Sequence, residues 1–196
     1  MNDFSTKEYI LEDLKGKLKK SRFLHTIGVS DTAACLAMRY HSDVEAAILA
    51  GLLHDCAKGF SKEEQLALVD KYSIKLNEAE QLNHELIHAK LGAKLANEIY
   101  KVDSKEIINS IRYHTTGRPE MTLLEKILYV ADYIEPNRYK QKRLDLIRRV
   151  AFEDIDKCIK MITEDTLDYL KETNSPIDPL TEETYKYYAG ESNGRN

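Results

Sequence analysis

Apolar residues recur at helical spacing along nearly all of the 196-residue chain. No stretch alternates apolar and polar residues between hairpin turns, as a half-buried strand would. The pattern therefore predicts an all-α fold, a compact helical bundle in a single domain. Nine helices are expected, and their predicted ranges are 6–19, 22–40, 44–57, 62–71, 78–100, 104–114, 123–134, 143–150 and 152–172.

Local signals support some of these helix starts. Ser61 and Glu64 have the spacing of a capping box, and Ser42 or Asp43 is expected to cap the helix that follows. Residues 174–179 cannot be helical because they contain two prolines. The tyrosines within residues 185–188 are expected to fold back or to lie over a pocket, and no helix is predicted there.

The composition argues against several classes of function. The net charge of -4 gives no overall positive field, so no nucleic-acid partner is expected. Residues 1–20 are charged throughout, and no stretch approaches the roughly 20 apolar residues of a membrane span, so neither a leader nor a membrane association is expected. The three cysteines are odd in number and far apart, which argues against disulfides and thiolate zinc sites and favours the reducing cytoplasm.

The dipeptide His54-Asp55 closes an apolar helical run over residues 46–53 that should be buried. An unpaired buried carboxylate costs several kcal/mol, roughly, and a divalent cation is the strongest compensating charge. Asp132 repeats this logic in another nearly uncharged helical stretch. Three further candidate ligands lie at intervals along the chain, so that five segments could converge on one pocket: His25, His88 and His114.

Histidine nitrogens and carboxylate oxygens without a thiolate favour iron, manganese, zinc or cobalt over calcium. When one coordination position stays open, such an ion lowers the pKa of bound water toward about 7 and polarises a phosphoryl or carbonyl oxygen. The residues therefore indicate a metal-dependent hydrolase and leave the identity of the ion open.

Four motifs carry these residues in a defined order. They are Arg22-Phe-Leu-His-Thr, Ala50-Gly-Leu-Leu-His-Asp-Cys-Ala-Lys58, Tyr113-His-Thr-Thr-Gly-Arg-Pro119 and Ala131-Asp-Tyr-Ile-Glu-Pro136. In this order and with these flanks, the chain resembles the YqeK branch of the HD-domain phosphohydrolase superfamily. The resemblance implies a helical bundle of the HD-domain type. It also implies a symmetrical bis(5'-nucleosyl)-tetraphosphatase activity, which splits diadenosine tetraphosphate into two ADP with bound iron.

The resemblance also suggests how the chain is organised. Its motifs span most of residues 20–140, so this part is expected to form the HD core of a single domain over 1–196. Helices over about 141–190 are expected to cover that core, and the polar tail over 191–196 is expected to be frayed. The implied small-molecule partner is a dinucleoside polyphosphate or ADP, and a homodimer is expected.

The family's functional positions can be carried over one by one. Its metal ligands fall on His25, His54, Asp55 and Asp132. Its nucleotide contacts fall on Arg22, His25, Asp55, Lys58, His88, His114, Asp132 and Arg138. Positive groups are expected here, because a tetraphosphate carries several negative charges and more develop on the leaving phosphate.

The residues predicted to be catalytic are Asp55, His88 and His114. Asp55 is expected to hold both the ion and a metal-activated water that attacks a central phosphorus, with ADP as the leaving group. His88 and His114 are expected to steady the phosphates or to protonate the leaving oxygen, or else to bind a second ion.

One rival motif points to a protease. The segment from His84 to His88 reads His-Glu-Leu-Ile-His, the signature in which two histidines one helical turn apart bind zinc. The extended form of that signature fails, because Leu91 and Lys94 stand where its glycine and third histidine should be. A downstream glutamate could still act as the third ligand, but a protease would leave the other four motifs unexplained.

Two further functions fit the same scaffold, because a fold does not dictate its substrate. One is a 5'-nucleotidase or a deoxynucleotide phosphohydrolase, which the product of the reaction would distinguish. The other is a non-catalytic nucleotide sensor, which would bind a nucleotide tightly without turnover.

Overall fold

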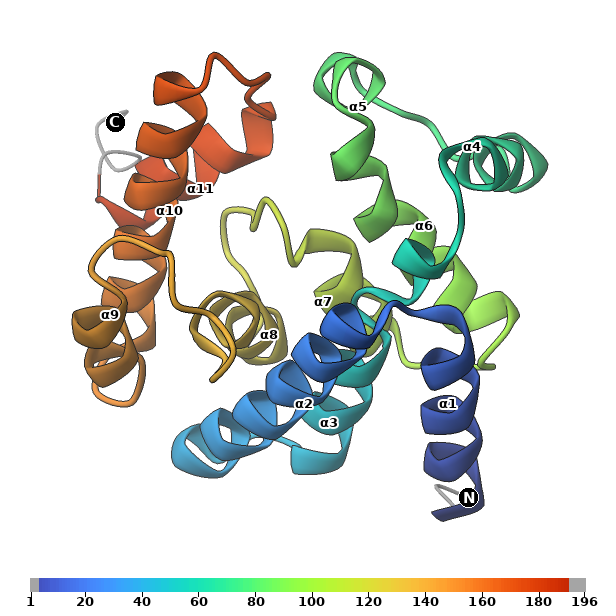
Figure 1. Cartoon of the computed structure of the whole chain (residues 1–196). Helices are drawn as coiled ribbons and strands as arrows, with labels where there is room; N and C mark the ends of the chain where they lie inside the picture. Colours follow the sequence, from blue (N-terminus) through green and yellow to red (C-terminus); the bar gives the residue numbers. More distant parts are fainter. Residues whose placement is uncertain (1–3, 191–196) are drawn as a thin grey trace.

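The computed structural model describes residues 4–190 and is helical without strands across them (Figure 1). The predicted all-α fold is thus confirmed. The α-helices are α1 (Phe4–Lys17), α2 (Lys20–Tyr40), α3 (Val44–Leu53), α4 (Lys62–Lys71), α5 (Glu78–Leu82), α6 (Ile87–Glu98), α7 (Lys105–Tyr113), α8 (Leu123–Ile134), α9 (Leu144–Ala151), α10 (Ile155–Glu172) and α11 (Pro179–Tyr188). Two 3₁₀ helices are η1 (Cys56–Gly59) and η2 (His84–Leu86). No helix in the described part of the chain is both long and apolar enough to cross a bilayer.

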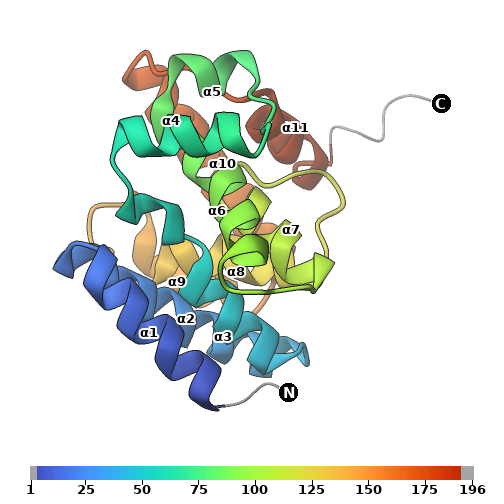
Figure 2. The same ribbon diagram turned by 90° about the vertical axis from the view of Figure 1, so that its right-hand side faces the viewer.

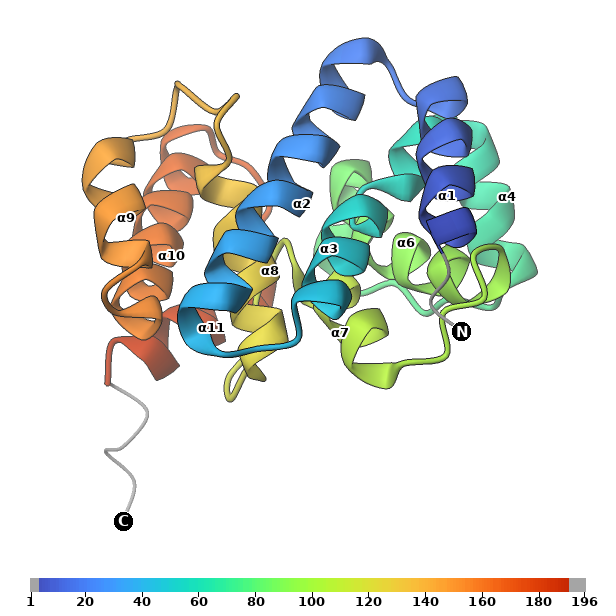
Figure 3. The ribbon, with the colours of Figure 1, turned by 90° about the horizontal axis from the view of Figure 1, so that it is seen from below.

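Helices α2, α3, α7 and α8 pack on one another at the centre of the bundle. In Figures 1 and 3, helices α9–α11 lie on one side of this centre, and α1 and α4 lie on the other. Figure 2 shows α4 and α5 together at the end of the molecule opposite α1–α3. One continuous apolar core joins these parts and includes Leu14, Leu36, Leu53, Leu91 and Ile127. The central helices are therefore held from both sides, which fixes the side chains that they carry inward.

The predicted caps are present. The Ser61 hydroxyl accepts from the Glu64 N–H while the Glu64 carboxylate accepts from the Ser61 N–H, which confirms the capping box of α4. Asp43, rather than Ser42, caps α3 by accepting from the Ala46 N–H. The start and direction of α3, which carries His54 at its end, are therefore set by a local hydrogen bond.

Two predicted helices have the wrong extent. The helix expected over 44–57 ends at Leu53, so His54 and Asp55 form the turn into η1. The single helix expected over 78–100 is divided, because the backbone of Asn83 is extended (φ -121°, ψ 96°) and its side chain accepts from the N–H two residues later. An asparagine that caps the following turn interrupts a helix even where the apolar spacing continues.

The helix α11 was not predicted. Pro179 lies in its first turn, where a missing N–H costs nothing, and the Asp178 carboxylate accepts from the Leu180 N–H. It packs on α10 and places Tyr185 at a pocket between the two helices. The tail over 191–196, expected to be frayed, lies outside the described residues.

Candidate metal centre

Six of the side chains predicted at the site meet in the centre of the bundle. They are His25 from α2, His54 and Asp55 from the turn after α3, His88 from α6, His114 from the end of α7, and Asp132 from α8. They form three overlapping groups of three, and the ligand atoms within each group lie within 4.8 Å of one another. All six are buried except Asp132, whose side chain is 20% exposed. The fold therefore brings together side chains that the sequence separates by more than a hundred residues.

Three of the four histidines are oriented in the same way. The Nδ1 atoms of His54, His88 and His114 lie 2.7, 2.5 and 2.7 Å from the carbonyl oxygen three residues earlier. A carbonyl only accepts, so each Nδ1 carries the proton and each Nε2 is directed into the cluster. For His54 and His114 these carbonyls lie in the last turn of an α-helix, where no helical N–H uses them.

The fourth histidine, His25, lies inside α2, and its Nδ1 is 3.0 Å from Oε1 of Glu135. Glu135 follows α8 directly and is almost fully buried. No role for Glu135 was predicted from the sequence. The available signal was an acid three residues after Asp132, at the end of the same apolar helix.

Asp55 lies at the middle of the cluster and serves both halves of it. Its Oδ2 is 3.7 Å from Nε2 of His25 and 3.4 Å from Nε2 of His54. Its Oδ1 is 3.2 Å from Nε2 of His88 and 3.9 Å from Nε2 of His114. Asp132 belongs to the first half, since its Oδ1 is 3.0 Å from Nε2 of His25. The two oxygens of Asp55 thus face two neighbouring sets of donors.

The spacing of these donor atoms fits a bound cation. Nε2 of His25 lies 3.3 Å from Nε2 of His54, and Nε2 of His88 lies 3.1 Å from Nε2 of His114. Ligand atoms that bind one ion at about 2.0–2.1 Å lie roughly 2.8–3.4 Å apart in octahedral or tetrahedral geometry. A neutral imidazole that donates through Nδ1 has only a lone pair at Nε2, and a cation satisfies several such lone pairs at once.

The charges in the cluster also favour a bound cation. Burial lowers the pKa of His88 to about 3 and that of His114 to about 4, so both rings are neutral at pH 7. Burial acts to raise the pKa of Asp55, but His54 and other positive neighbours hold it well below its usual value. Burial also acts to raise the pKa of Asp132, but the neighbouring His25 ring and the Arg138 guanidinium hold it well below its usual value. Two ionised carboxylates beside the neutral rings of His88 and His114 attract positive charge.

Positive side chains line the rim. Arg22 donates to Oδ2 of Asp55 at 2.7 Å, and Arg138 donates to Oδ1 of Asp132 at 2.6 Å. Their side chains are 37% and 32% exposed, so each reaches from the buried cluster to solvent. Both line a cleft of about 580 Å³ together with His25. Lys58, the third predicted cation, pairs instead with the exposed Glu85 of η2.

The protease signature does not form a site of its own. His84 lies in η2 and His88 in α6, so the regular helix that would align them is broken. Within residues 4–190, none of the groups of three close ligands includes His84 or Glu85. In the structure His88 lies with the HD residues, and His84 lies outside this cluster.

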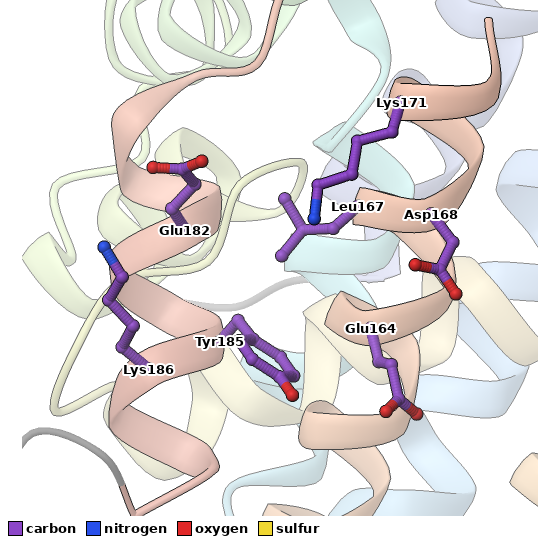
Figure 4. A pocket seen from close by; sticks show the side chains of 7 residues that line it. All are labelled: Glu164, Leu167, Asp168, Lys171, Glu182, Tyr185 and Lys186. Atoms are coloured by element: carbon purple, nitrogen blue, oxygen red, sulfur yellow. The ribbon is translucent and has the colours of Figure 1, made fainter.

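Another pocket lies between α10 and α11 (Figure 4). Its walls carry acids and lysines side by side, among them Glu164 and Asp168 on α10 and Lys186 on α11. Tyr185 points into it, as expected of a tyrosine in this segment. No histidine lines it, and none of the groups of close ligands in the described chain lies there. The cluster in the central helices is therefore the candidate site.

Comparison with known proteins gives consistent findings. The sequence model of the family described as HD domain matches residues 22–137. The chain is 39% identical over 181 residues to a Bacillus subtilis protein named bis(5'-nucleosyl)-tetraphosphatase, symmetrical, and the match covers 92% of this chain and 96% of that protein. It is 33% identical to a Staphylococcus aureus protein of the same name, over 89% of this chain and 90% of that one.

A crystal structure from Clostridium acetobutylicum has the same fold. That protein is described as a predicted HD superfamily hydrolase involved in NAD metabolism. The two structures superpose with a TM-score of 0.90 at 36% sequence identity, over 94% of this chain and 97% of that one. The sequence match and the structural match therefore each extend over nearly the whole chain.

Proposed function

Because the chain belongs to the HD domain family and, within it, to the symmetrical bis(5'-nucleosyl)-tetraphosphatases, we propose that it is a metal-dependent phosphohydrolase acting on dinucleoside tetraphosphates. The reaction would split diadenosine tetraphosphate at its centre into two ADP. One observation carries the proposal: four histidines and two aspartates from five segments direct their donor atoms to one buried centre beside two arginines. A nucleotide sensor that lacks catalysis would not need this complete set.

The ion would be held by His25, His54, Asp55 and Asp132, and iron is the ion that we propose. Nitrogen and oxygen donors without a thiolate suit iron(II), as they suit manganese, cobalt and zinc. The group of Asp55, His88 and His114 would suit a second ion. When bound, a divalent cation supplies Lewis-acid activation of water and of the phosphoryl group.

The arginines and Lys58 would bind the phosphate chain. Arg22 and Arg138 already reach the edge of the cluster, and a guanidinium has five N–H donors, so part of each remains for phosphate oxygens. The cations would also neutralise the charge that develops on the leaving ADP. Lys58 must exchange Glu85 for a phosphate, and this is an easy exchange because the glutamate is 77% exposed.

The protonation states suggest roles for the other residues. Rings with pKa values of about 3 and 4 hold no proton at pH 7, so His88 and His114 are poor general acids. We propose that they act through Nε2 as ligands or as acceptors of hydrogen bonds in the phosphate site. Asp55, ionised at neutral pH, would accept a hydrogen bond from the attacking water and orient it.

The test is product analysis. Full-length protein loaded in parallel with iron(II), manganese, cobalt or zinc is incubated with diadenosine tetraphosphate, and the nucleotides are separated by chromatography. ADP as the only product supports the proposal. AMP with ATP would show asymmetric cleavage, and no turnover with any ion would favour the sensor. In parallel incubations, release of adenosine and phosphate from AMP, or of deoxyadenosine and phosphate from dAMP, would instead favour a nucleotidase. A cytoplasmic location, a homodimer and the absence of a nucleic-acid partner stay predictions from the sequence.

A further inference from the structure

Glu135 is a buried carboxylate directly behind the cluster. It is 1% exposed, and its Oε1 lies 3.0 Å from Nδ1 of His25. Its Oε2 accepts from the backbone N–H of Asn137 at 2.7 Å and from the Asn137 side-chain amide at 2.9 Å. Three donors therefore hold the carboxylate in one orientation, which is what a buried charge requires.

His25 needs such a partner more than the other histidines do. Those three donate through Nδ1 to a backbone carbonyl three residues earlier. His25 lies inside α2, where the carbonyls of the preceding turn accept the N–H groups of the helix itself. Only a side chain from another element can then accept from Nδ1, and Glu135 is the group that lies against this atom.

The helix that carries His25 leaves room for this carboxylate. A Cβ atom added at Gly28, one turn after His25, would collide with Oε2 of Glu135. Gly28 has ordinary helical geometry, so the requirement for glycine here is the space that Glu135 occupies. Residues 28 and 135 are thereby coupled.

We infer that Glu135 is a positioning residue: its carboxylate holds the Nδ1–H of His25 and directs Nε2 toward Asp132 and His54. A carboxylate partner also makes the ring a more basic ligand, so it raises the affinity of the cluster for its cation. The inference rests on the proposed function, because it requires a cation at the cluster.

The test compares divalent-ion affinity among variants of the full-length protein. Mn²⁺ is titrated into chelator-stripped protein, and free Mn²⁺ is counted by electron paramagnetic resonance. The two carboxylate oxygens of Glu135 accept from three donors, and glutamine in its place has only one acceptor oxygen. We therefore expect Glu135→Gln to bind Mn²⁺ about tenfold more weakly, and Glu135→Ala to approach a 100-fold loss of affinity. Gly28→Ala should weaken binding as well, because it displaces the carboxylate without removing it.

A matched control separates positioning from stability. Glu125 is also 1% exposed and is paired with Arg118, but it caps the start of α8. Glu125→Gln should lower the thermal stability and leave Mn²⁺ affinity unchanged. The Arg148 guanidinium donates to the carbonyls of residues 134, 135 and 138, so the loop of Glu135 keeps its backbone support in the variants.

The outcomes distinguish the two proposals. Native affinity in Glu135→Gln and Gly28→Ala, measured on folded protein, would overturn the role of Glu135 and leave the proposed function standing. A native protein that binds no Mn²⁺ would overturn both. Weakened binding in these two variants, with native binding in Glu125→Gln, supports the inference even if Glu135→Ala does not fold.

Discussion

Acid should destabilise the cation-free protein through two buried histidines. Burial lowers the pKa of His88 to about 3 and that of His114 to about 4, from a value near 6.5 in the unfolded chain. Between these limits the unfolded chain binds more protons than the folded protein does. The stability that these groups provide is therefore complete above pH 6.5 and is lost as the pH falls from 6.5 toward 4.

The size of the effect follows from linkage. Each histidine removes about 1.4 kcal/mol of unfolding free energy per pH unit, so about 2 kcal/mol each, and about 4 kcal/mol together, is lost by pH 5. The pKa of His54 is raised, because Asp55 outweighs its burial, so this ring adds stability as the pH falls toward 6.5 and contributes little further slope well below that value. The low pKa values of Asp55 and Asp132 contribute only under more acidic conditions. A loss of this size is a large share of the 5–15 kcal/mol typical of a domain.

The assay is urea unfolding of chelator-treated protein at pH 7, 6 and 5, followed by circular dichroism. His114→Asn should remove about half of the decline. His41→Asn is the matched control, because His41 is exposed in a left-handed conformation at the end of α2 that asparagine tolerates. An unfolding free energy that stays constant from pH 7 to pH 5 would refute the reasoning.

Three further predictions concern single side chains. Asp55→Ala should lose Mn²⁺ retention and ADP release together, and a variant that keeps both would remove Asp55 from the site. Arg22→Gln should raise KM for diadenosine tetraphosphate while metal analysis finds native content, whereas an unchanged KM would contradict its phosphate role. Gly51→Ala should lower the unfolding free energy in urea by about 1–3 kcal/mol, because its Cβ would lie 2.6 Å from Cα of Ser30 and push α3 away from α2. Native stability would show that these two helices can separate without loss.

Much of the fold could be predicted because the helices are amphipathic and their caps are local. The ranges 62–71 and 123–134 were correct to the residue, since Ser61 and Thr122 each begin a capping box. The break at Asn83 was missed because apolar spacing continues across it, and spacing alone does not report one extended residue. Helix α11 was missed because its amphipathic pattern is short and follows a proline-rich segment.

The order of the motifs was enough to predict which residues lie at the candidate site, but not all of their contacts. The six side chains predicted at the site lie close together in the fold, and each comes from a helix or from the turn that follows one. The partner of Lys58 and the contact between His25 and Glu135 could not be derived, because both depend on how distant segments approach one another. Glu135 is a buried acid beside Pro136, and a residue of this kind can have many structural roles. Its contact with His25 of α2 distinguishes among them.

The spread of the ligands along the chain has a consequence for how the protein is made. The first of the proposed ligands is residue 25 and the last is residue 132, so a ribosome must add two thirds of the 196 residues before the proposed set is complete. A nascent or truncated chain that ends before α8 would lack Asp132 and Glu135, the carboxylate proposed to orient His25. Tight loading of the ion would thus follow synthesis of the central bundle. Because an ion that binds only the folded state stabilises it by mass action, supply of the metal would determine how much of the newly made protein persists.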